Sequence, residues 1–253
     1  MFRGETDLSR ARGVKAQRRQ QYPVLENTID FDQAAKPRTR KIEVVPKSRG
    51  QETLVLALNN DNLHIIIAVG PAGTGKTYLA MQAAIKALRT GQVEKIVLTR
   101  PAVGVDDEKH GFLPGDLNQK MEPWTRPLLD VLHEYYSPKD VAKMLEDQVI
   151  EISPLAFMRG RTFKHAWIVA DEMQNATPNQ MKMLLTRIGT GSRIIVTGDV
   201  EQADRKNPDN GLLDIASRLD SSPTAGLEVC RLGSRDVQRH PIITSVLKIY
   251  GSD

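Results

Sequence analysis

Short apolar runs alternate with longer amphipathic segments along the chain from about residue 50 onward. Six runs have the length and composition of buried strands: 64–69, 95–100, 149–153, 165–170, 193–198 and 227–232. Four segments carry a helical pattern: 77–90, 128–147, 178–188 and 238–250. Gly91 ends the first of these helices and Pro178 begins the third. This alternation predicts an α/β fold, in which a parallel sheet is covered by helices on both faces.

The first 48 residues lack this pattern and run into the connector PRTRKIEVVPKSRG, residues 37–50. Residues 1–50 hold 12 Lys and Arg against 6 Asp and Glu, whereas the rest of the chain holds 23 against 25. The sequence therefore predicts a flexible basic arm and connector at 1–48 and one domain at 49–253. The arm could neutralise nucleic-acid phosphates or remain a solvated, disordered tail, and composition favours neither.

Composition narrows the class of protein. The chain is 40% hydrophobic and 26% charged, which is ordinary for a soluble globular protein. Apolar stretches such as IIIAV, residues 65–69, are too short to cross a membrane, and the N-terminus lacks the apolar core of a secretory signal. Cys230 is the single cysteine, so an intramolecular disulfide is excluded. We therefore expect a cytoplasmic protein without a membrane partner.

The segment GPAGTGKT, residues 70–77, matches every position of the phosphate-binding P-loop pattern. It follows a predicted strand and opens a predicted helix, so a merely structural glycine-rich turn is disfavoured. Backbone N–H groups of such a loop surround phosphates, and the helix N-terminus adds partial positive charge. Lys76 is expected to contact the β- and γ-phosphates and Thr77 to contact Mg²⁺. The predicted nucleotide-binding residues are Gly70, Pro71, Ala72, Gly73, Thr74, Gly75, Lys76 and Thr77.

A second motif, IVADEMQN at 168–175, ends an apolar run in two adjacent carboxylates. Asp171, at the end of a buried strand, is placed to hold Mg²⁺ through its water shell. Glu172 can polarise an attacking water. A solvated acidic pair at a strand end is the alternative. Because a kinase does not need a water-activating glutamate here, the pair favours hydrolysis of a nucleoside triphosphate.

A third motif, VTGDVEQ at 196–202, is weaker when taken alone. A Gly-Asp pair after a strand, here Gly198 and Asp199, is often only a turn. Gln202 can direct its amide at the γ-phosphate or at the attacking water. The motif gains weight because it follows the other two in the expected order.

These motifs, together with TRPAVG (99–104), SPLAFMRGRTF (153–163) and RHP (239–241), resemble the PhoH-like proteins. These are phosphate-starvation-inducible P-loop ATPases related to superfamily 1 helicases, and the resemblance covers roughly residues 50–250. It implies a RecA-like ATPase core that uses ATP and Mg²⁺. It also implies a ring-shaped homohexamer and a role in RNA unwinding or metabolism.

The resemblance assigns further roles by position. It implies that Gln174 couples the nucleotide state to the neighbouring motif, that Gln202 senses the γ-phosphate and that Gln51 reads the adenine edge. Arg239 resembles the family's C-terminal arginine, a candidate finger on the γ-phosphate of a neighbouring subunit. Met173 replaces an alanine common in the family, and we expect its side chain to point away from the phosphates. The residues implied in catalysis are Lys76, Glu172, Gln202 and Arg239.

Nucleic-acid contacts are expected near TRPAVG, which resembles a helicase motif that lies along a strand of nucleic acid. The chain after residue 50 is slightly acidic, so a binding groove would be local rather than a whole face. For each candidate a structural or subunit-interface role is an equal alternative, and tryptophan is more typical of a core. The candidates are Thr99, Arg100, Lys120, Trp124, Arg126, Arg159 and Arg161.

Two functions remain open. The first is an oligomeric ATPase coupled to single-stranded RNA or DNA. The sequence has one P-loop and little room for a second RecA-like domain, so we expect the completing arginine to come from a neighbouring subunit. The second is a nucleotide-gated binding or scaffold protein that hydrolyses ATP slowly and recruits partners through the arm. A small-molecule kinase is disfavoured by Glu172 and by the lack of an obvious arginine-bearing lid.

Overall fold

The structure is a computed structural model that describes residues 42–101, 126–200, 210–239, 242 and 249. The chain divides into two units, 1–36 and 37–253, and every described residue lies in the second unit. Residues 42–48, at the end of the predicted arm, form neither helix nor strand. Among the described residues, no helix is both long enough and apolar enough to span a membrane.

Six strands of the described chain form one sheet in which every pairing is parallel. They are β1 (Ile65–Val69), β2 (Lys95–Thr99), β3 (Ile150–Ile152), β4 (Ala166–Ala170), β5 (Arg193–Gly198) and β6 (Leu227–Arg231). Their order across the sheet is β3-β2-β4-β5-β1-β6. Each observed strand lies within a predicted run, so the predicted parallel sheet is confirmed.

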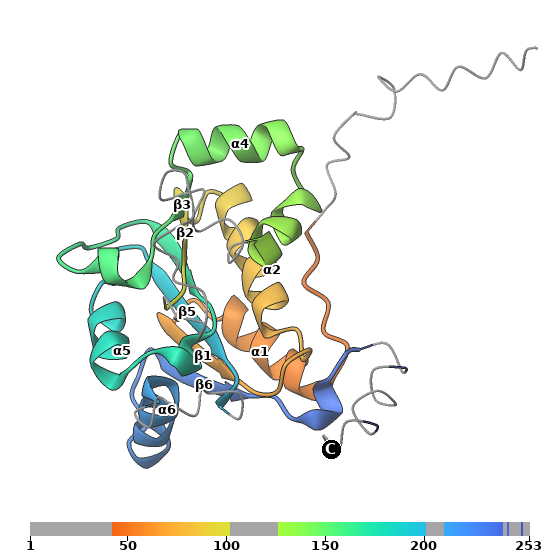
Figure 1. Ribbon diagram of the computed structural model, residues 1–253, viewed down its shortest axis with the longest axis vertical. Coiled ribbons are helices and arrows are strands. Elements are labelled where there is room, and N and C mark those ends of the chain that lie inside the picture. Colours follow the sequence, from red (N-terminus) through yellow and green to blue (C-terminus); the bar gives the residue numbers. More distant parts are fainter. Residues whose placement is uncertain (1–41, 102–125, 201–209, 240–241, 243–248, 250–253) are drawn as a thin grey trace, which may run out of the picture. The chain divides into compact units, whose positions relative to one another are not determined.

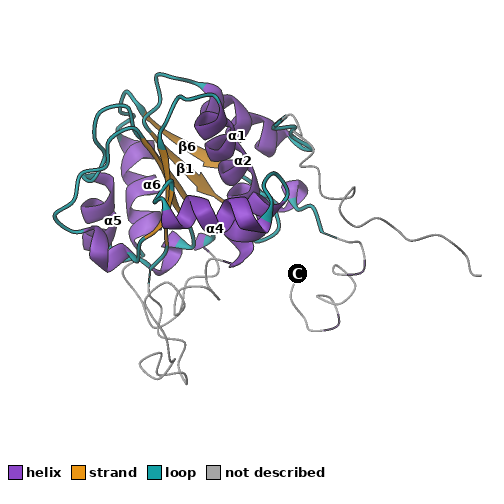
Figure 2. Cartoon of the chain, turned by 90° about the horizontal axis from the view of Figure 1, so that it is seen from above, coloured by secondary structure: helices purple, strands orange, loops and turns teal. Residues whose placement is uncertain are grey.

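Helices cover both faces of this sheet (Figures 1 and 2). One face carries α1 (Arg49–Asn59), α2 (Lys76–Arg89), the helical residues 126–133 and α4 (Pro138–Glu146). The other carries α5 (Pro178–Leu185), α6 (Gly211–Ser221) and the 3-10 turns η2 (Leu155–Met158) and η3 (Met173–Asn175). A last turn, η5 (Ser234–Asp236), follows β6.

Alternate side chains of each central strand enter two separate cores. In β1, Ile66 and Ala68 pack with α1 and α2, whereas Ile65 and Ile67 pack toward α5 and α6. This is the two-residue period of a strand that is buried on both faces. It explains why the strands are apolar throughout, and it leaves the strand ends as the places where polar side chains can collect.

The helices differ from the prediction in several places. The helical segment expected at 128–147 is two helices, because Ser137 and Pro138 begin a new one. The Ser137 hydroxyl accepts from the Asp140 N–H, and the Asp140 carboxylate accepts from the Ser137 N–H. This reciprocal cap, with proline in the first turn, starts α4 independently of the preceding helix.

The helix predicted at 178–188 ends earlier, at Leu185. The carbonyl of Arg187 accepts from the Phe163 N–H, and Ile188 pairs with Phe163 in an isolated parallel bridge. This pairing replaces the last helical turn. In the segment predicted as a helix at 238–250, residues 238 and 239 are not helical, 242 and 249 are, and the others lie outside the described residues. Helices α1 and α6 were not predicted.

Candidate nucleotide site

The P-loop joins β1 to α2 at the carboxyl end of the sheet. Gly73 and Gly75 both have a φ of 82°, in the left-handed region that glycine adopts without steric cost. Gly75 is also the N-cap of α2, so the helix begins at Lys76. The loop therefore has the backbone conformation that places N–H groups around an anion at a helix N-terminus.

Lys76 is buried inside the curve of the loop. Its Nζ donates to the carbonyls of Gly70 (2.7 Å) and Pro71 (2.8 Å). Burial lowers the pKa of Lys76, although three nearby carboxylates act in the opposite direction. The ammonium is thus held by loop carbonyls, at a position where phosphate oxygens of a ligand can replace them.

Asp171 follows β4 and lies beside the first turn of α2. Its Oδ1 accepts from the hydroxyl of Thr77 (2.7 Å) and from the hydroxyl of Thr197 (2.6 Å). Asp171 is buried, and Thr197 comes from β5, the strand between β1 and β4. A hydroxyl and a carboxylate oxygen side by side fit Mg²⁺, which takes one or two protein oxygens together with waters and phosphate oxygens.

A continuous set of polar contacts, which we call the relay, links the P-loop to Glu172. The Ala72 N–H donates to Asp199 Oδ2 (3.0 Å), and the Asp199 N–H donates to Gln174 Oε1 (3.1 Å). Gln174 Nε2 donates to Glu172 Oε2 (2.5 Å), and the other Glu172 oxygen lies 3.8 Å from Arg100 Nη2. Glu172 itself has a φ of 54°, which is uncommon for a residue with a side chain. The contacts of the relay fix the side chain of Glu172, and its backbone is in the left-handed region.

These side chains surround a pocket of about 240 Å³ at the carboxyl end of the sheet. The structure thus brings together four residues predicted from separate motifs: Lys76, Thr77, Asp171 and Glu172. Gln202, the predicted γ-phosphate sensor, lies outside the described residues. Met173 is fully buried in the core on the α5–α6 face, as expected for a side chain that points away from the phosphates.

Gln51, for which the resemblance implies a role in reading the adenine edge, lies against the P-loop. It is 4% exposed, its Nε2 donates to the Thr74 carbonyl (3.0 Å) and its Oε1 accepts from the Lys47 N–H (2.8 Å). Both ends of the amide are therefore in use within the chain. In this structure Gln51 attaches α1 to the P-loop.

Arg239 lies over the P-loop of its own chain. The Gln238 N–H donates to the Gly73 carbonyl (2.8 Å), and a Cβ added at Gly73 would clash with the Arg239 side chain. The positive charge of Arg239 acts on Lys76 to lower the pKa of that lysine further. The arginine is thus next to the phosphate site, but next to the site of the same chain.

The candidates for nucleic-acid contact are spread over several environments. Thr99 is 2% exposed, and its buried hydroxyl has no partner among the described residues, so a ligand cannot reach it in this structure. Arg100 points to Glu172. Lys120 and Trp124 lie outside the described residues.

Arg161 is paired with Glu151 of β3, which also accepts from Lys95 (3.1 Å). Burial alone would raise the pKa of Glu151, but the hydrogen bonds from Arg161 and Lys95 outweigh it and lower that pKa. Arg126 and Arg159 are exposed. Arg161 is exposed as well, but it is held in the ion pair with Glu151.

Sequence reasoning missed two residues of the site. Thr197 was placed in a predicted strand, and Asp199 was placed in the third motif. Neither residue was given a role in the site. The signal for both was their place at the end of β5, because carboxyl ends of parallel strands meet at one edge of the sheet.

The loop between β1 and α2, the Thr77–Asp171 pair and the all-parallel sheet define an α/β fold of the P-loop class. Known sequences then narrow the class. A profile described as PhoH-like protein matches residues 43–251. The chain belongs to the PhoH-like family.

Relatives in three organisms show how far the similarity extends. The PhoH-like protein of Bacillus subtilis is 40% identical over 94% of this chain and 72% of its own length. The PhoH-like protein of Synechocystis is 42% identical over 84% of this chain and 64% of its own length. Protein PhoH of Escherichia coli is 37% identical over 78% of this chain and 58% of its own length. The match thus spans between just over half and about three-quarters of each relative.

Solved structures match more distantly. The Pyrococcus furiosus Hef helicase domain has a TM-score of 0.44 and 14% identity, covering 74% of this chain and 38% of that one. The Sulfolobus solfataricus SWI2/SNF2 ATPase core in complex with dsDNA has a TM-score of 0.45 and 15% identity, covering 80% and 48%.

Proposed function

We propose that the chain binds ATP with Mg²⁺ and hydrolyses it to ADP and phosphate. The observation that carries this proposal is the arrangement around the pocket of about 240 Å³, which we call the phosphate pocket. There the Thr77 hydroxyl lies 2.7 Å from Asp171 Oδ1, and Lys76 lines the same pocket. Thr77 and Asp171 would hold Mg²⁺, which neutralises charge on the phosphates, and Lys76 contacts the β- and γ-phosphates. Glu172, whose side chain is 37% exposed, accepts a proton from the attacking water.

The test is Glu172→Gln, because glutamine keeps the size of the side chain but cannot accept the proton. We expect ATP turnover, measured as phosphate release, to fall by about 10²- to 10⁴-fold. Affinity for ATP, measured by calorimetry, should stay close to that of the parent. Glu228→Gln on the exposed side of β6 is the matched control. Parental turnover in Glu172→Gln would refute the role given to Glu172.

The proposal includes coupling of hydrolysis to single-stranded RNA or DNA, with binding or unwinding as the output, in the cytoplasm. Family membership and the contact between Glu172 and Arg100, in the segment that resembles a helicase motif, support this coupling. Phosphate release is measured with and without a single-stranded 20-mer. Stimulation supports coupling, whereas an unchanged slow rate supports the nucleotide-gated scaffold.

We also propose a homohexameric ring in which Arg239 completes the site of the neighbouring subunit. Because Arg239 lies on Gly73 of its own loop here, this role requires it to leave that position on assembly. Mixing two inactive variants, Lys76→Ala and Arg239→Ala, decides the question. A trans finger predicts recovered turnover, since Arg239→Ala sites then receive Arg239 from Lys76→Ala subunits. If turnover stays absent although mixed oligomers form, Arg239 acts within its own chain.

A further inference from the structure

A hollow of about 530 Å³ lies between η2 and α5, away from the phosphate pocket. Arg159, directly after η2, and Lys182 of α5 line it from the two sides, and we call it the η2–α5 groove. Phe157, on the same turn as the groove wall, is 60% exposed. An exposed aromatic ring two residues from Arg159, on one wall of a groove with a second cation on the other wall, suggests a ligand with both flat and anionic groups.

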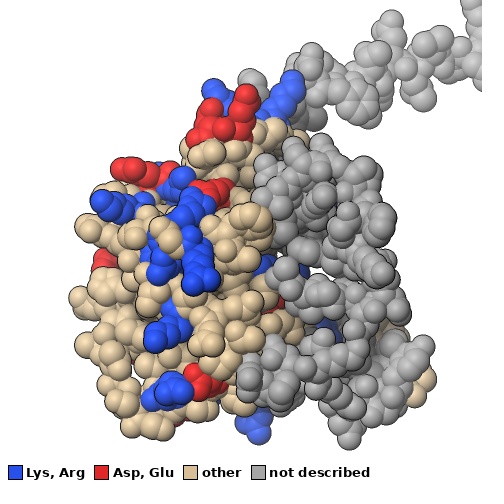
Figure 3. All heavy atoms as spheres, turned by 60° about the vertical axis from the view of Figure 1, so that its left-hand side comes forward, with Lys and Arg blue, Asp and Glu red and all other residues tan. Residues whose placement is uncertain are grey.

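The charged residues that line the groove have one sign: Arg159 and Lys182 line it, and no acidic residue is among its described lining residues. Figure 3 shows Lys and Arg side chains gathered along the middle of the face that carries α5 in Figure 1. A local concentration of positive charge on a chain that is slightly acidic after residue 50 attracts a polyanion to this place.

The cations of this surface are not equally available. Arg161 is neutralised by Glu151, and Arg187 donates to the carbonyls of Met183 (3.0 Å) and Arg161 (3.0 Å). Arg159 and Lys182 are exposed and form no ion pair with another described residue. Their charges are therefore free to meet phosphates of a ligand in the groove.

We propose that the η2–α5 groove binds single-stranded nucleic acid, with phosphates on Arg159 and Lys182 and a base stacked on Phe157. Proteins that bind single strands combine cations that follow the backbone with aromatic rings on which bases stack. A double helix hides its bases from such a ring, so a single strand fits better. This inference rests on the proposed function and names the surface through which the nucleic acid acts.

The position of the groove connects it to the catalytic glutamate. The Leu155 N–H, in the first residue of η2, donates to the Arg100 carbonyl (3.3 Å), and the Arg100 guanidinium contacts Glu172. On the other side, α5 begins shortly after Gln174 in the chain. Both walls of the groove are thus attached to residues of the relay. A nucleic-acid strand in the groove therefore acts on the elements that flank Glu172.

The test measures binding of a fluorescent single-stranded 20-mer to the full chain by anisotropy over a range of salt concentrations. In the double variant R159Q/K182Q, affinity should fall at least about tenfold at moderate salt. The slope of log affinity against log salt should become shallower by about 0.7 for each lost phosphate contact. Phe157→Ala should weaken binding by roughly tenfold with the slope unchanged, because stacking involves no counterion.

The control is K139Q/K143Q, which removes two exposed cations from α4 on the opposite face of the sheet. It should bind like the parent, and the thermal unfolding midpoint should not move in any of the variants. If the parent binds and the groove variants bind equally well, the groove is the wrong place. If they instead change the sedimentation of the oligomer at unchanged affinity, the surface is a subunit contact and the inference fails.

A parent chain that binds no oligonucleotide overturns the inference and the nucleic-acid part of the proposed function together. That outcome leaves ATP hydrolysis to be judged by Glu172→Gln. The failure of the groove and the failure of the ATPase proposal are therefore distinguishable.

Discussion

The two ends of the parallel sheet both carry a hollow, and the larger hollow lies at the end without a catalytic arrangement. At the amino end, a cavity of about 680 Å³ is lined by residues such as His64, Trp167 and Arg193. At the carboxyl end, the phosphate pocket measures about 240 Å³.

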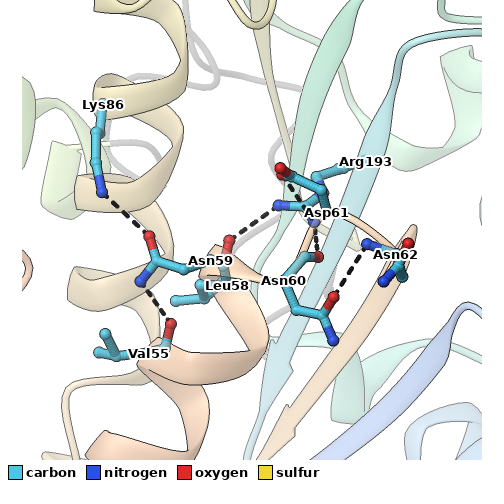
Figure 4. Close-up of polar contacts among 8 residues, drawn as sticks. All are labelled: Val55, Leu58, Asn59, Asn60, Asp61, Asn62, Lys86 and Arg193. Carbon is cyan, nitrogen blue, oxygen red and sulfur yellow. Dashed lines mark hydrogen bonds and ion pairs between the residues drawn. The ribbon is translucent and has the colours of Figure 1, made fainter.

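At the amino end, the hydrogen bonds of Arg193 go to backbone carbonyls. The Arg193 guanidinium donates to the carbonyls of Leu58 (2.9 Å) and Asn60 at the end of α1, and lies 3.8 Å from Asp61 (Figure 4). The same guanidinium lies 5.3 Å from the centre of the Trp167 ring. These contacts satisfy carbonyls that a helix end leaves unpaired, so they stabilise the fold.

Polar side chains at the carboxyl end contact one another and still face the pocket. Asp171 accepts from two hydroxyls, and Gln174 joins Glu172 to Asp199. Groups that are fixed by their neighbours but open to a ligand are what a reaction needs. The two ends therefore differ in what their polar side chains contact. At the carboxyl end, side chains contact other side chains around a pocket, whereas the Arg193 guanidinium at the amino end donates to backbone carbonyls.

The largest expected effect breaks the carboxyl end. Lys76→Ala removes the ammonium from the P-loop, and we expect ATP turnover to fall by on the order of 10²- to 10³-fold or more, as for the loss of a charge-stabilising group. Phosphate release provides the measurement. Lys86→Ala, an exposed lysine later in the same helix, should retain parental turnover. Equal losses in both variants would mean that the effect comes from α2 rather than from the phosphate site.

The amino end should respond in stability instead. Arg193→Met keeps much of the apolar stem but leaves the Leu58 and Asn60 carbonyls without their charged donor. We expect a loss of about 2 kcal/mol in the free energy of unfolding, followed by urea denaturation, with turnover unchanged in the folded protein. Arg218→Met on the exposed face of α6 should unfold like the parent, because exposed ion pairs contribute little. A large loss of turnover in Arg193→Met would contradict the division between the two ends.

A smaller effect tests the relay itself. Gln174→Met keeps the volume of a buried side chain but removes both hydrogen bonds, to Glu172 and from Asp199. We expect turnover to fall about tenfold, the equivalent of roughly one charge-assisted hydrogen bond, with ATP affinity nearly unchanged. Gln92→Met, beside the larger cavity, serves as the same substitution at the other end. Parental turnover in Gln174→Met would show that Glu172 needs no such support.

The smallest expected effect is on the stability of the fold at low pH. Asp236 accepts from the N–H groups of Gly233 (2.7 Å) and Gly50 (3.0 Å), and these hydrogen bonds, with one from Ser48, lower the pKa of its carboxyl. Its stabilisation is therefore fully present above the unfolded-state pKa of about 3.9 and is lost as the pH falls through that value toward the lower folded pKa.

Asp236→Asn should accordingly lose less stability than the parent between about pH 5 and pH 3, as judged by urea midpoints at both values. Asp236 ties η5 to the start of α1, so the substitution probes a carboxylate near the phosphate site whose contacts are all to the fold. A steeper acid loss in the variant than in the parent would contradict the direction of this pKa shift.

Local patterns predicted the parts of the fold that depend on short segments. The run RIIVTG gives β5 because every residue after Arg193 is apolar or small and both faces of the sheet are covered. Lys76 and Thr77 were found because a P-loop places its functional residues at fixed distances along the chain. By contrast, α1 was missed because LVLAL (54–58) has the continuous apolar form of a strand as well as of a helix.

Contacts between distant segments could not be predicted from the sequence. Asp199 reaches the Ala72 N–H only because β5 lies next to β1 in the sheet, which a linear pattern does not state. Likewise, Arg159 and Lys182 face one hollow only because η2 packs against α5. The chemistry of the site was thus readable in pieces, whereas its assembly required the order of the strands.

The relay also links the binding of ATP thermodynamically to the binding of nucleic acid in the groove. It runs without interruption from the Ala72 N–H through Asp199, Gln174 and Glu172 to Arg100, whose carbonyl holds the first residue of η2. If a strand bound at the groove changes the affinity for ATP by some factor, linkage requires ATP to change the affinity for the strand by the same factor. Measuring either affinity with the other ligand present therefore reports on both. A chain connected in this way would bind its nucleic acid more tightly or more weakly according to the nucleotide that it holds.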